Sequence, residues 1–111
     1  MRDYIYVDDL VMGLLRVGMI EKQYTDRCFN LGTSKGTSFI AMVDTVIRVV
    51  ARGRKVTVPW PKDYEKNETG DFVANIDRLL KLFPEGYEFT SLEDGVRKTH
   101  EFYEIYRTQY F

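Results

Sequence analysis

Apolar residues at helical spacing form the clearest periodic pattern in the chain. Phe39, Val43, Val46 and Val50 recur three or four positions apart, which places them on one side of a helix. Narrower apolar faces with similar spacing occur in three other stretches. We therefore predict helices over residues 8–20, 38–52, 76–83 and 91–107.

Shorter stretches alternate between apolar and polar side chains, which is the spacing of a β-strand. In residues 2–7, Ile5 and Val7 alternate with Tyr4 and Tyr6. Further strands are predicted for residues 27–31 and 55–58, with a brief extended piece over 71–74. Because strands and helices alternate, we predict an α/β (α+β-like) fold with a small sheet of few short strands and three to four helices.

Polar residues mark where the predicted helices begin. Asp8 and Asp9 stand at the start of the first helix, where carboxylates are favoured by unpaired N–H groups and by the helix dipole. Thr37 or Ser38 is expected to cap the second helix. Residues 90–93 read Thr-Ser-Leu-Glu, which predicts a capping box before the last helix.

The composition excludes several classes of protein. The 111 residues are 44% hydrophobic and 30% charged, which suits one small domain over residues 1–111. Because the 16 basic and 17 acidic side chains nearly cancel, neither nucleic acid nor a membrane is expected as a partner. No apolar run reaches the roughly 20 residues that span a bilayer. With no signal peptide and Cys28 as the only cysteine, we expect a cytoplasmic protein without disulfides.

The beginning of the chain carries a recognisable motif. Residues 2–9 read R-D-Y-I-Y-V-D-D, which closely resembles the R-D-[YF]-[IV]-[HY]-V-x-D signature of the NAD-dependent epimerase/dehydratase family. These extended short-chain dehydrogenases act on nucleotide sugars. In the family the signature lies well past the middle of the chain, whereas here it begins at residue 2.

Four further motifs follow in the order that the family has them. Phe29–Thr33 resembles Y-N-[LI]-G-[TS], and Gly36–Phe39 resembles G-x-S followed by an apolar residue at a helix start. Gly70–Ile76 resembles G-D-x-x-A-D-I, with Asn75 where aspartate is usual. Ser91–Val96 resembles S-L-E-E-G-[LI], which opens the family's last helix. The likeness therefore runs nearly from end to end.

Two parts of the complete enzymes are absent from this sequence. The family's NAD site is a Gly-rich turn after its first strand, whereas Gly32 and Gly36 follow a late strand without an acidic residue at the right spacing. The catalytic Tyr-x-x-x-Lys pair is missing, because no tyrosine has a lysine four positions on. The resemblance thus implies the C-terminal part of an extended short-chain dehydrogenase fold, with no catalytic residue and no cofactor in this chain, inactive alone.

The resemblance also implies which residues bind substrate. Arg2 would reach the diphosphate of a nucleotide sugar, because a guanidinium offers forked donors and stays charged; the alternative is a solvated residue at a frayed end. Tyr4 would line the same pocket, or belong to the core. Phe39 matches a position against the nucleotide base, and anchoring its helix to the sheet is a compatible role.

Residues 62–70 would form the other half of the nucleotide site. Family members often carry an arginine there, followed three residues on by an acid that holds the ribose hydroxyls. Glu68 fits the acid, whereas the arginine position falls on Glu65, with Lys66 beside it. A lysine binds phosphate as a point charge without forked geometry, so a tight diphosphate site is not expected. The alternative is a solvated, charged loop.

The remaining reactive side chains have simpler explanations. His100 is the only histidine and has no partner at ligand spacing, so no metal site is expected. Cys28 lies in a predicted strand and is expected to be a small core residue. Trp60, between two prolines, would cover a sheet edge or stack on a base or sugar.

Two functions stay open from the sequence. The chain is either the part of an NAD-dependent epimerase or dehydratase that binds a nucleoside diphosphate sugar, or a self-associating or weakly nucleotide-binding module without activity. By resemblance, the apolar helix 38–52 would pack against a Rossmann domain that these residues do not supply. We therefore expect a homodimer or larger assembly, with helix 38–52 or helix 91–107 at its centre.

Overall fold

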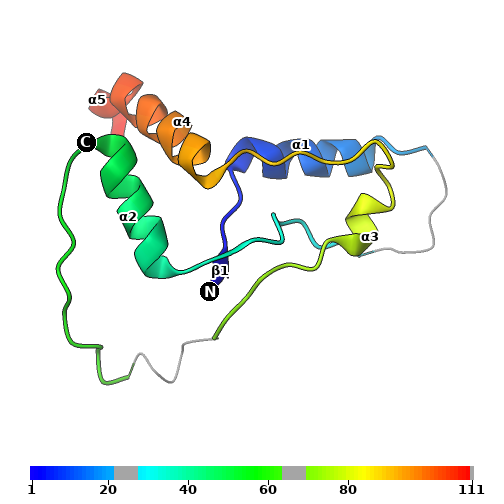
Figure 1. Ribbon diagram of the computed structural model, residues 1–111. Coiled ribbons are helices and arrows are strands. Elements are labelled where there is room, and N and C mark those ends of the chain that lie inside the picture. The colour runs from blue at the N-terminus through cyan, green and yellow to red at the C-terminus, as the bar shows by residue number, and fades with distance from the viewer. Residues whose placement is uncertain (22–27, 64–69, 111) are drawn as a thin grey trace.

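The computed structural model describes residues 1–21, 28–63 and 70–110, which combine helices with one small sheet (Figure 1). The elements are β1 (Arg2–Asp3), α1 (Val7–Gly18), β2 (Gly36–Thr37), α2 (Phe39–Val50), α3 (Asp77–Leu80), α4 (Leu92–Ile105) and α5 (Arg107–Tyr110). The expectation of a mixed chain with a small sheet is confirmed at this level. None of the described helices is long and apolar enough to cross a membrane.

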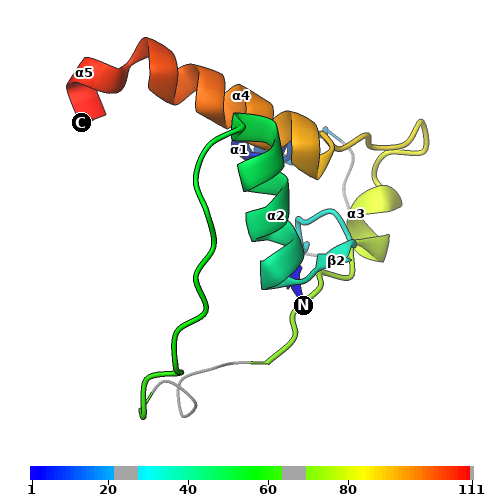
Figure 2. The same ribbon diagram turned by 60° about the vertical axis from the view of Figure 1, so that its left-hand side comes forward.

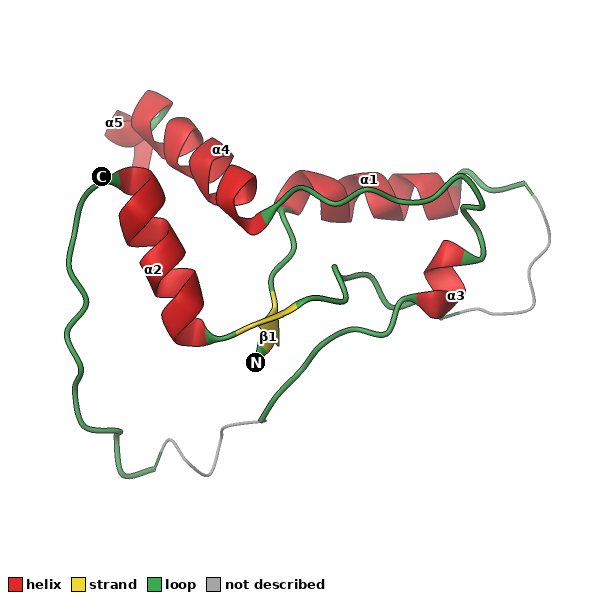
Figure 3. Cartoon of the chain, viewed as in Figure 1, coloured by secondary structure: helices red, strands yellow, loops and turns green. Residues whose placement is uncertain are grey.

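The sheet joins the start of the chain to the residues before α2 (Figure 3). Strands β1 and β2 are antiparallel, with Arg2 opposite Thr37 and Asp3 opposite Gly36. Phe72 adds an isolated parallel bridge to Arg2. Three stretches that are distant in sequence therefore meet at the first residues of the chain.

The sheet is smaller than the sequence predicted. Of the expected strand over residues 2–7, only residues 2–3 pair with a neighbour, and residues 28–31 and 55–58 form no strand. A strand persists only where another backbone accepts and donates its hydrogen bonds, and alternation along the chain supplies no such neighbour. Val56 and Val58 accordingly remain 70% and 71% exposed. Cys28, expected in the core, is exposed.

The predicted helices form close to their expected positions. Ser38, the second of the two proposed caps, accepts a hydrogen bond from the backbone N–H of Ala41 at 3.1 Å and begins α2. Helix α2 ends at Val50. The next residue, Ala51, is the C-cap and has a left-handed φ of 55°. The last predicted helix is divided in two at Tyr106, which gives α4 and the short α5.

A small hydrophobic core lies between α1 and α3. Its buried members are Ala74, Ile76, Leu79 and Phe83, and Leu79 is only 1% exposed. Gly13 lets α1 lie close to Leu31, because a Cβ at position 13 would be 2.6 Å from a methyl carbon of Leu31. We call this part, together with α1, α3 and β1, whose Asp3 accepts a hydrogen bond from the core residue Ala74, the core half.

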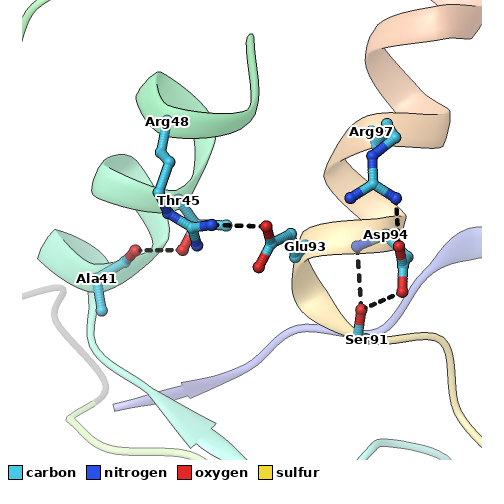
Figure 4. A network of polar contacts seen from close by, with 7 residues as sticks. All are labelled: Ala41, Thr45, Arg48, Ser91, Glu93, Asp94 and Arg97. Carbon is cyan, nitrogen blue, oxygen red and sulfur yellow. Dashed lines mark hydrogen bonds and ion pairs between the residues drawn. The ribbon is translucent and has the colours of Figure 1, made fainter. Parts of the chain in front are cut away.

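Helices α2 and α4 pack against each other at the opposite end (Figure 2). No residue of α2 is buried, although its apolar face is broad. Arg48 of α2 forms an ion pair with Glu93 of α4 at 2.6 Å, and both side chains are largely exposed (Figure 4). We call α2, α4 and α5 the groove half.

Candidate functional site

Of the predicted substrate-binding residues, Arg2 and Phe39 lie close to the point where β1 pairs with β2. The backbone of Arg2 pairs with Thr37, two residues before Phe39 at the start of α2. On its other side Arg2 bridges to Phe72, whose backbone N–H donates to the carbonyl oxygen of Met1 at 3.0 Å. We call this meeting point the Arg2 junction.

The Arg2 side chain extends toward the end of the predicted substrate loop. Its guanidinium donates a hydrogen bond to the carbonyl oxygen of Gly70, and another to that of Met1 at 3.3 Å. The predicted site residues Lys66 and Glu68 lie outside the described residues. Gly70 is the last residue of the predicted substrate loop 62–70. The Arg2 guanidinium is therefore held next to the C-terminal end of that loop.

Phe39 lies near the Arg2 junction but does not anchor its helix. The side chain is 73% exposed, so the interpretation as an anchor to the sheet is wrong. As the first residue of α2, it stands where the helix dipole favours negative charge. An exposed aromatic ring at a helix N-terminus can stack on a base while the N-terminus favours a nearby phosphate.

Tyr4 contributes to a different surface from Phe39. It lines a groove of about 1050 Å³ between residues 3–7 and the helices α2 and α4. The structure therefore brings Arg2 and Phe39 to one junction and places Tyr4 beyond it, on the wall of this groove.

The groove has an apolar interior and a charged end. Val46, Val50, Leu92 and Val96 supply much of its apolar lining. Polar and charged side chains from the ends of α2 and α4 also line it, namely Arg52, His100, Tyr103, Glu104 and Arg107. Sequence reasoning treated His100 alone, although His100, Tyr103 and Glu104 of α4 are three and four residues apart and so share one face of the helix, with Arg107 following at the start of α5.

Asp3 is a structural residue that sequence reasoning missed. One carboxylate oxygen accepts hydrogen bonds from the backbone N–H of Thr33, at 2.9 Å, and from its hydroxyl. The other accepts from the backbone N–H groups of Ser34 and Ala74, at 3.0 and 3.2 Å. Burial raises the pKa of Asp3, but the bonds from Thr33, Ala74 and Ser34 together outweigh burial and hold it below its ordinary value.

Asp9 makes a comparable connection, which corrects its expected role as a helix cap. Its carboxylate accepts hydrogen bonds from the backbone N–H and the hydroxyl of Thr90, at 2.7 and 2.9 Å. The Tyr87 hydroxyl donates to the backbone carbonyl of Asp9 at 2.7 Å. Asp9 therefore ties α1 to the residues that precede α4.

The start of α4 uses a cap shifted by one residue from the predicted box. Ser91 accepts from the backbone N–H of Asp94 at 3.1 Å, and its hydroxyl donates to the Asp94 carboxylate at 2.6 Å (Figure 4). Hydrogen bonds from Ser91 and Arg97 lower the pKa of Asp94. Glu93, the predicted partner in the box, pairs with Arg48 instead.

The turn that begins at Gly32 does not suit a dinucleotide phosphate. A Cβ on Gly32 would lie 2.6 Å from the Ala74 side chain and 2.7 Å from the Asp3 carboxylate, so this glycine makes room for an acid. The neighbouring N–H groups of Thr33 and Ser34 already donate to Asp3. A phosphate here would meet a carboxylate, so this turn does not fit NAD.

No protein-family model and no solved structure matches this chain. The likeness to epimerases and dehydratases therefore rests on the five sequence motifs. Across residues 1–21, 28–63 and 70–110, no three histidine, cysteine or acidic side chains gather in a group that could hold a metal ion.

Proposed function

We propose that this chain is the nucleotide-sugar-binding part of an NAD-dependent epimerase or dehydratase. It would be the C-terminal portion of an extended short-chain dehydrogenase fold, working with a Rossmann domain that binds NAD. In this proposal the chain holds and orients the substrate, and the reacting groups come from the cofactor-binding portion. The motifs at residues 2–9 and 70–76 support it.

One observation supports the proposal most directly, namely the meeting of three motif segments at the Arg2 junction. Arg2 belongs to the first signature, Thr37 to the segment that opens α2, and Phe72 to the segment after the substrate loop. The family resemblance assigns substrate contacts to Arg2, to Phe39 two residues after Thr37, and to the loop that precedes Phe72. Their convergence would let one ligand touch them together.

The chemistry of the junction favours a nucleoside diphosphate. The Arg2 guanidinium and the N-terminus of α2 both favour a negatively charged phosphate, and the Phe39 ring offers a stacking face for a base. Tyr4 follows Arg2 by two residues of extended backbone, about 7 Å, a distance that a sugar attached to the diphosphate can span. The sugar would then point into the groove.

Binding by the chain alone is expected to be weak. The site is open, so few contacts offset the entropic cost of orienting the ligand. We therefore expect a Kd of about 1 mM or weaker for a nucleoside diphosphate. Without the Tyr-x-x-x-Lys pair, the purified chain supplied with NAD should not turn over any nucleotide sugar. Turnover under these conditions would contradict the proposal.

The test is an NMR titration with UDP, GDP, CDP and dTDP. Amide shifts should concentrate at residues 2–4, 37–40 and 70–72, and the variant Arg2→Met should lose them. Arg54→Met is the matched control, because it removes another exposed guanidinium, in the extended residues after α2. The proposal fails if the shifts lie elsewhere, if none occurs at 10 mM ligand (about ten times the expected Kd), or if both variants behave alike.

A further inference from the structure

Residues 51–63, which follow α2, stand apart from the helices. Figures 1 and 2 both show this stretch leaving the end of α2 and running away from the rest of the chain. Every residue in it is exposed, and residues 52–61 belong to no helix or strand. Ala51 and Gly53 have φ values of 55° and 93°, which an α-helix does not adopt. Pro59 and Pro61 then favour extended backbone at their own positions and at the residues before them.

Large apolar side chains are the first unusual feature of this stretch. Val56, Val58 and Trp60 are 70%, 71% and 56% exposed. They are alternate residues, and in extended backbone alternate side chains point to the same side. We call these three residues the apolar row. Any surface that removes the row from water would lower its free energy.

Positive charge is the second unusual feature. Because the whole chain is nearly neutral, no membrane was expected as a partner, but the charge is distributed unevenly. Asp44 and Asp63 flank residues 45–62, and between them every charged side chain is basic. The five basic residues are Arg48, Arg52, Arg54, Lys55 and Lys62. Local charge of one sign attracts an oppositely charged surface even when the net charge of the protein is close to zero.

Two of these cations frame the apolar row. Arg48 and Lys55 form ion pairs with acidic side chains of α4 and α2, at 2.6 Å each. Arg54 comes two residues before the row and Lys62 two residues after it, so the alternation places both on the side of the row. This side of residues 54–62 therefore carries an apolar centre with a cation at each end.

We propose that residues 54–62 bind the surface of an anionic lipid bilayer. The apolar row enters the headgroup region, where tryptophan is favoured, and Arg54 and Lys62 lie against the anionic headgroups. A backbone N–H that loses water without gaining a partner is costly, and Pro59 and Pro61 have no N–H to lose. The inference does not depend on the nucleotide sugar, because none of the predicted substrate-binding residues belongs to this segment.

Other partners fit the segment less well. The edge of a sheet would pair with its backbone, but Pro59 and Pro61 lack the N–H groups that a ladder needs, so the C-terminal part of the segment would stay outside the sheet. A nucleic acid would attract the cations and stack on Trp60, but it would leave the two valines in water. An anionic bilayer matches the cations and the apolar row together.

The first test uses the fluorescence of Trp60. It is the only tryptophan in the chain, so its emission reports on this segment alone. The full chain is titrated with vesicles of equal parts phosphatidylcholine and phosphatidylglycerol in about 0.1 M NaCl, where the screening length is about 10 Å. We expect the emission to shift to shorter wavelength and quenching by acrylamide to fall. Vesicles of phosphatidylcholine alone, and soluble glycerophosphoglycerol, should cause neither change.

Four results of this titration would overturn the proposal. Unchanged emission with the anionic vesicles would show that the segment does not bind lipid. Equal changes with phosphatidylcholine vesicles would show that the cations play no part. A change with soluble glycerophosphoglycerol would indicate a site for a free anion. A shift that appears without vesicles as the protein concentration rises would indicate that the segment pairs with another copy of the chain.

The role of the cations is tested by combining Arg54→Gln with Lys62→Gln. Each basic residue near an anionic surface contributes about fivefold to binding, so the double variant should bind the anionic vesicles about 30-fold more weakly. Arg78→Gln combined with Lys81→Gln is the matched control. It removes two exposed cations at α3, at the other end of the molecule (Figure 1), and should bind as the wild type does. Equal binding by the two double variants would contradict the proposal.

The role of the apolar row is tested by combining Val56→Ser with Val58→Ser, which keeps Trp60 as the reporter. Because each buried methylene contributes about fourfold, this variant should bind the anionic vesicles at least about tenfold more weakly. Leu14→Ser combined with Leu15→Ser is the control, because these side chains of α1 are also exposed, by 63% and 52%. Circular dichroism checks that each variant keeps its helices. Equal weakening in both variants would contradict a specific role for the row.

Discussion

The core half and the groove half bury their apolar side chains to very different extents. In the core half, Leu79 is 1% exposed and Phe83 is 5% exposed. In the groove half, α2 has no buried residue, and Val46 and Phe39 remain 37% and 73% exposed. Both halves contain amphipathic helices of 12 to 14 residues. An amphipathic helix therefore does not bury its apolar face by itself, and a covering surface must be present.

The polar contacts differ in the same way. In the core half, the partly buried carboxylates of Asp3 and Asp9 accept hydrogen bonds from residues 30 to 81 positions away in sequence. In the groove half, the contact that joins α2 to α4 is the exposed ion pair of Arg48 with Glu93. Water competes for exposed charges far more than for partly buried ones, so the core half should hold most of the stability.

Shortening a buried core side chain should have the largest effect. Leu79→Ala leaves a cavity in the core half and should lower the free energy of unfolding by about 2–5 kcal/mol. Urea denaturation followed by circular dichroism measures the change. Leu80→Ala, on the next residue of α3 and 38% exposed, is the control and should cost about 1 kcal/mol or less. Equal losses in the two variants would show that Leu79 is no better packed than its exposed neighbour, which would contradict a well-packed core half.

Asp3→Asn should have the second largest effect. The amide can accept through one oxygen only, and its nitrogen would face the N–H donors of Thr33 or of Ser34 and Ala74. We expect a loss of about 2 kcal/mol in the same urea experiment. Asp71→Asn removes an exposed carboxylate that pairs with the N-terminal amine, and it should cost less than Asp3→Asn, because water screens an exposed pair. A larger loss of unfolding free energy in Asp71→Asn than in Asp3→Asn would contradict the expectation that the partly buried carboxylate contributes more stability.

The stability of the core half should also depend on pH through Asp3. Because the pKa of Asp3 in the folded chain lies below its ordinary value of 3.8, this carboxylate contributes stability that is fully present above pH 3.8 and is lost as pH falls from there through the folded-state pKa. Unfolding free energies measured from pH 5 down to about pH 2 should therefore fall more steeply for the wild type than for Asp3→Asn. Parallel curves would show that Asp3 does not titrate differently on folding.

The ion pair of the groove half should give the smallest effect. A double-mutant cycle with Arg48→Met and Glu93→Gln should show a coupling of about 0–1 kcal/mol. The coupling should shrink further at about 1 M NaCl, where the screening length is about 3 Å. A coupling above about 2 kcal/mol that persists in salt would mean that this pair is protected from water, as it would be if a partner covered the groove half.

The parts of the fold that follow from local signals were predictable. Helix α2 begins after Ser38 and α4 after Ser91 because a serine hydroxyl accepts a nearby N–H of its own helix, a contact that needs no distant residue. The strands were not predictable from alternation. Val56 and Val58 alternate as strand residues do, yet among the described residues no backbone forms a strand with them.

The candidate site was predictable only in part. Arg2 and Phe39 were identified from motifs, and the structure places both at one junction. Tyr4 was assigned to the same pocket but lines the groove instead. Asp3 was not identified as a residue that holds the junction together, because its partners Thr33 and Ala74 lie 30 and 71 positions away and nothing local marks them.

The sequence by itself determined where the helices lie, which of their faces are apolar, and which motifs resemble a nucleotide-sugar enzyme, because each is encoded by spacing within a few residues. Only the tertiary structure decided that Arg2, Thr37 and Phe72 meet, that Asp3 fills the space left by Gly32, and that no residue of α2 is buried. Burial and strand pairing depend on surfaces brought together from distant parts of the chain, and a periodic pattern states only which side of an element needs a partner.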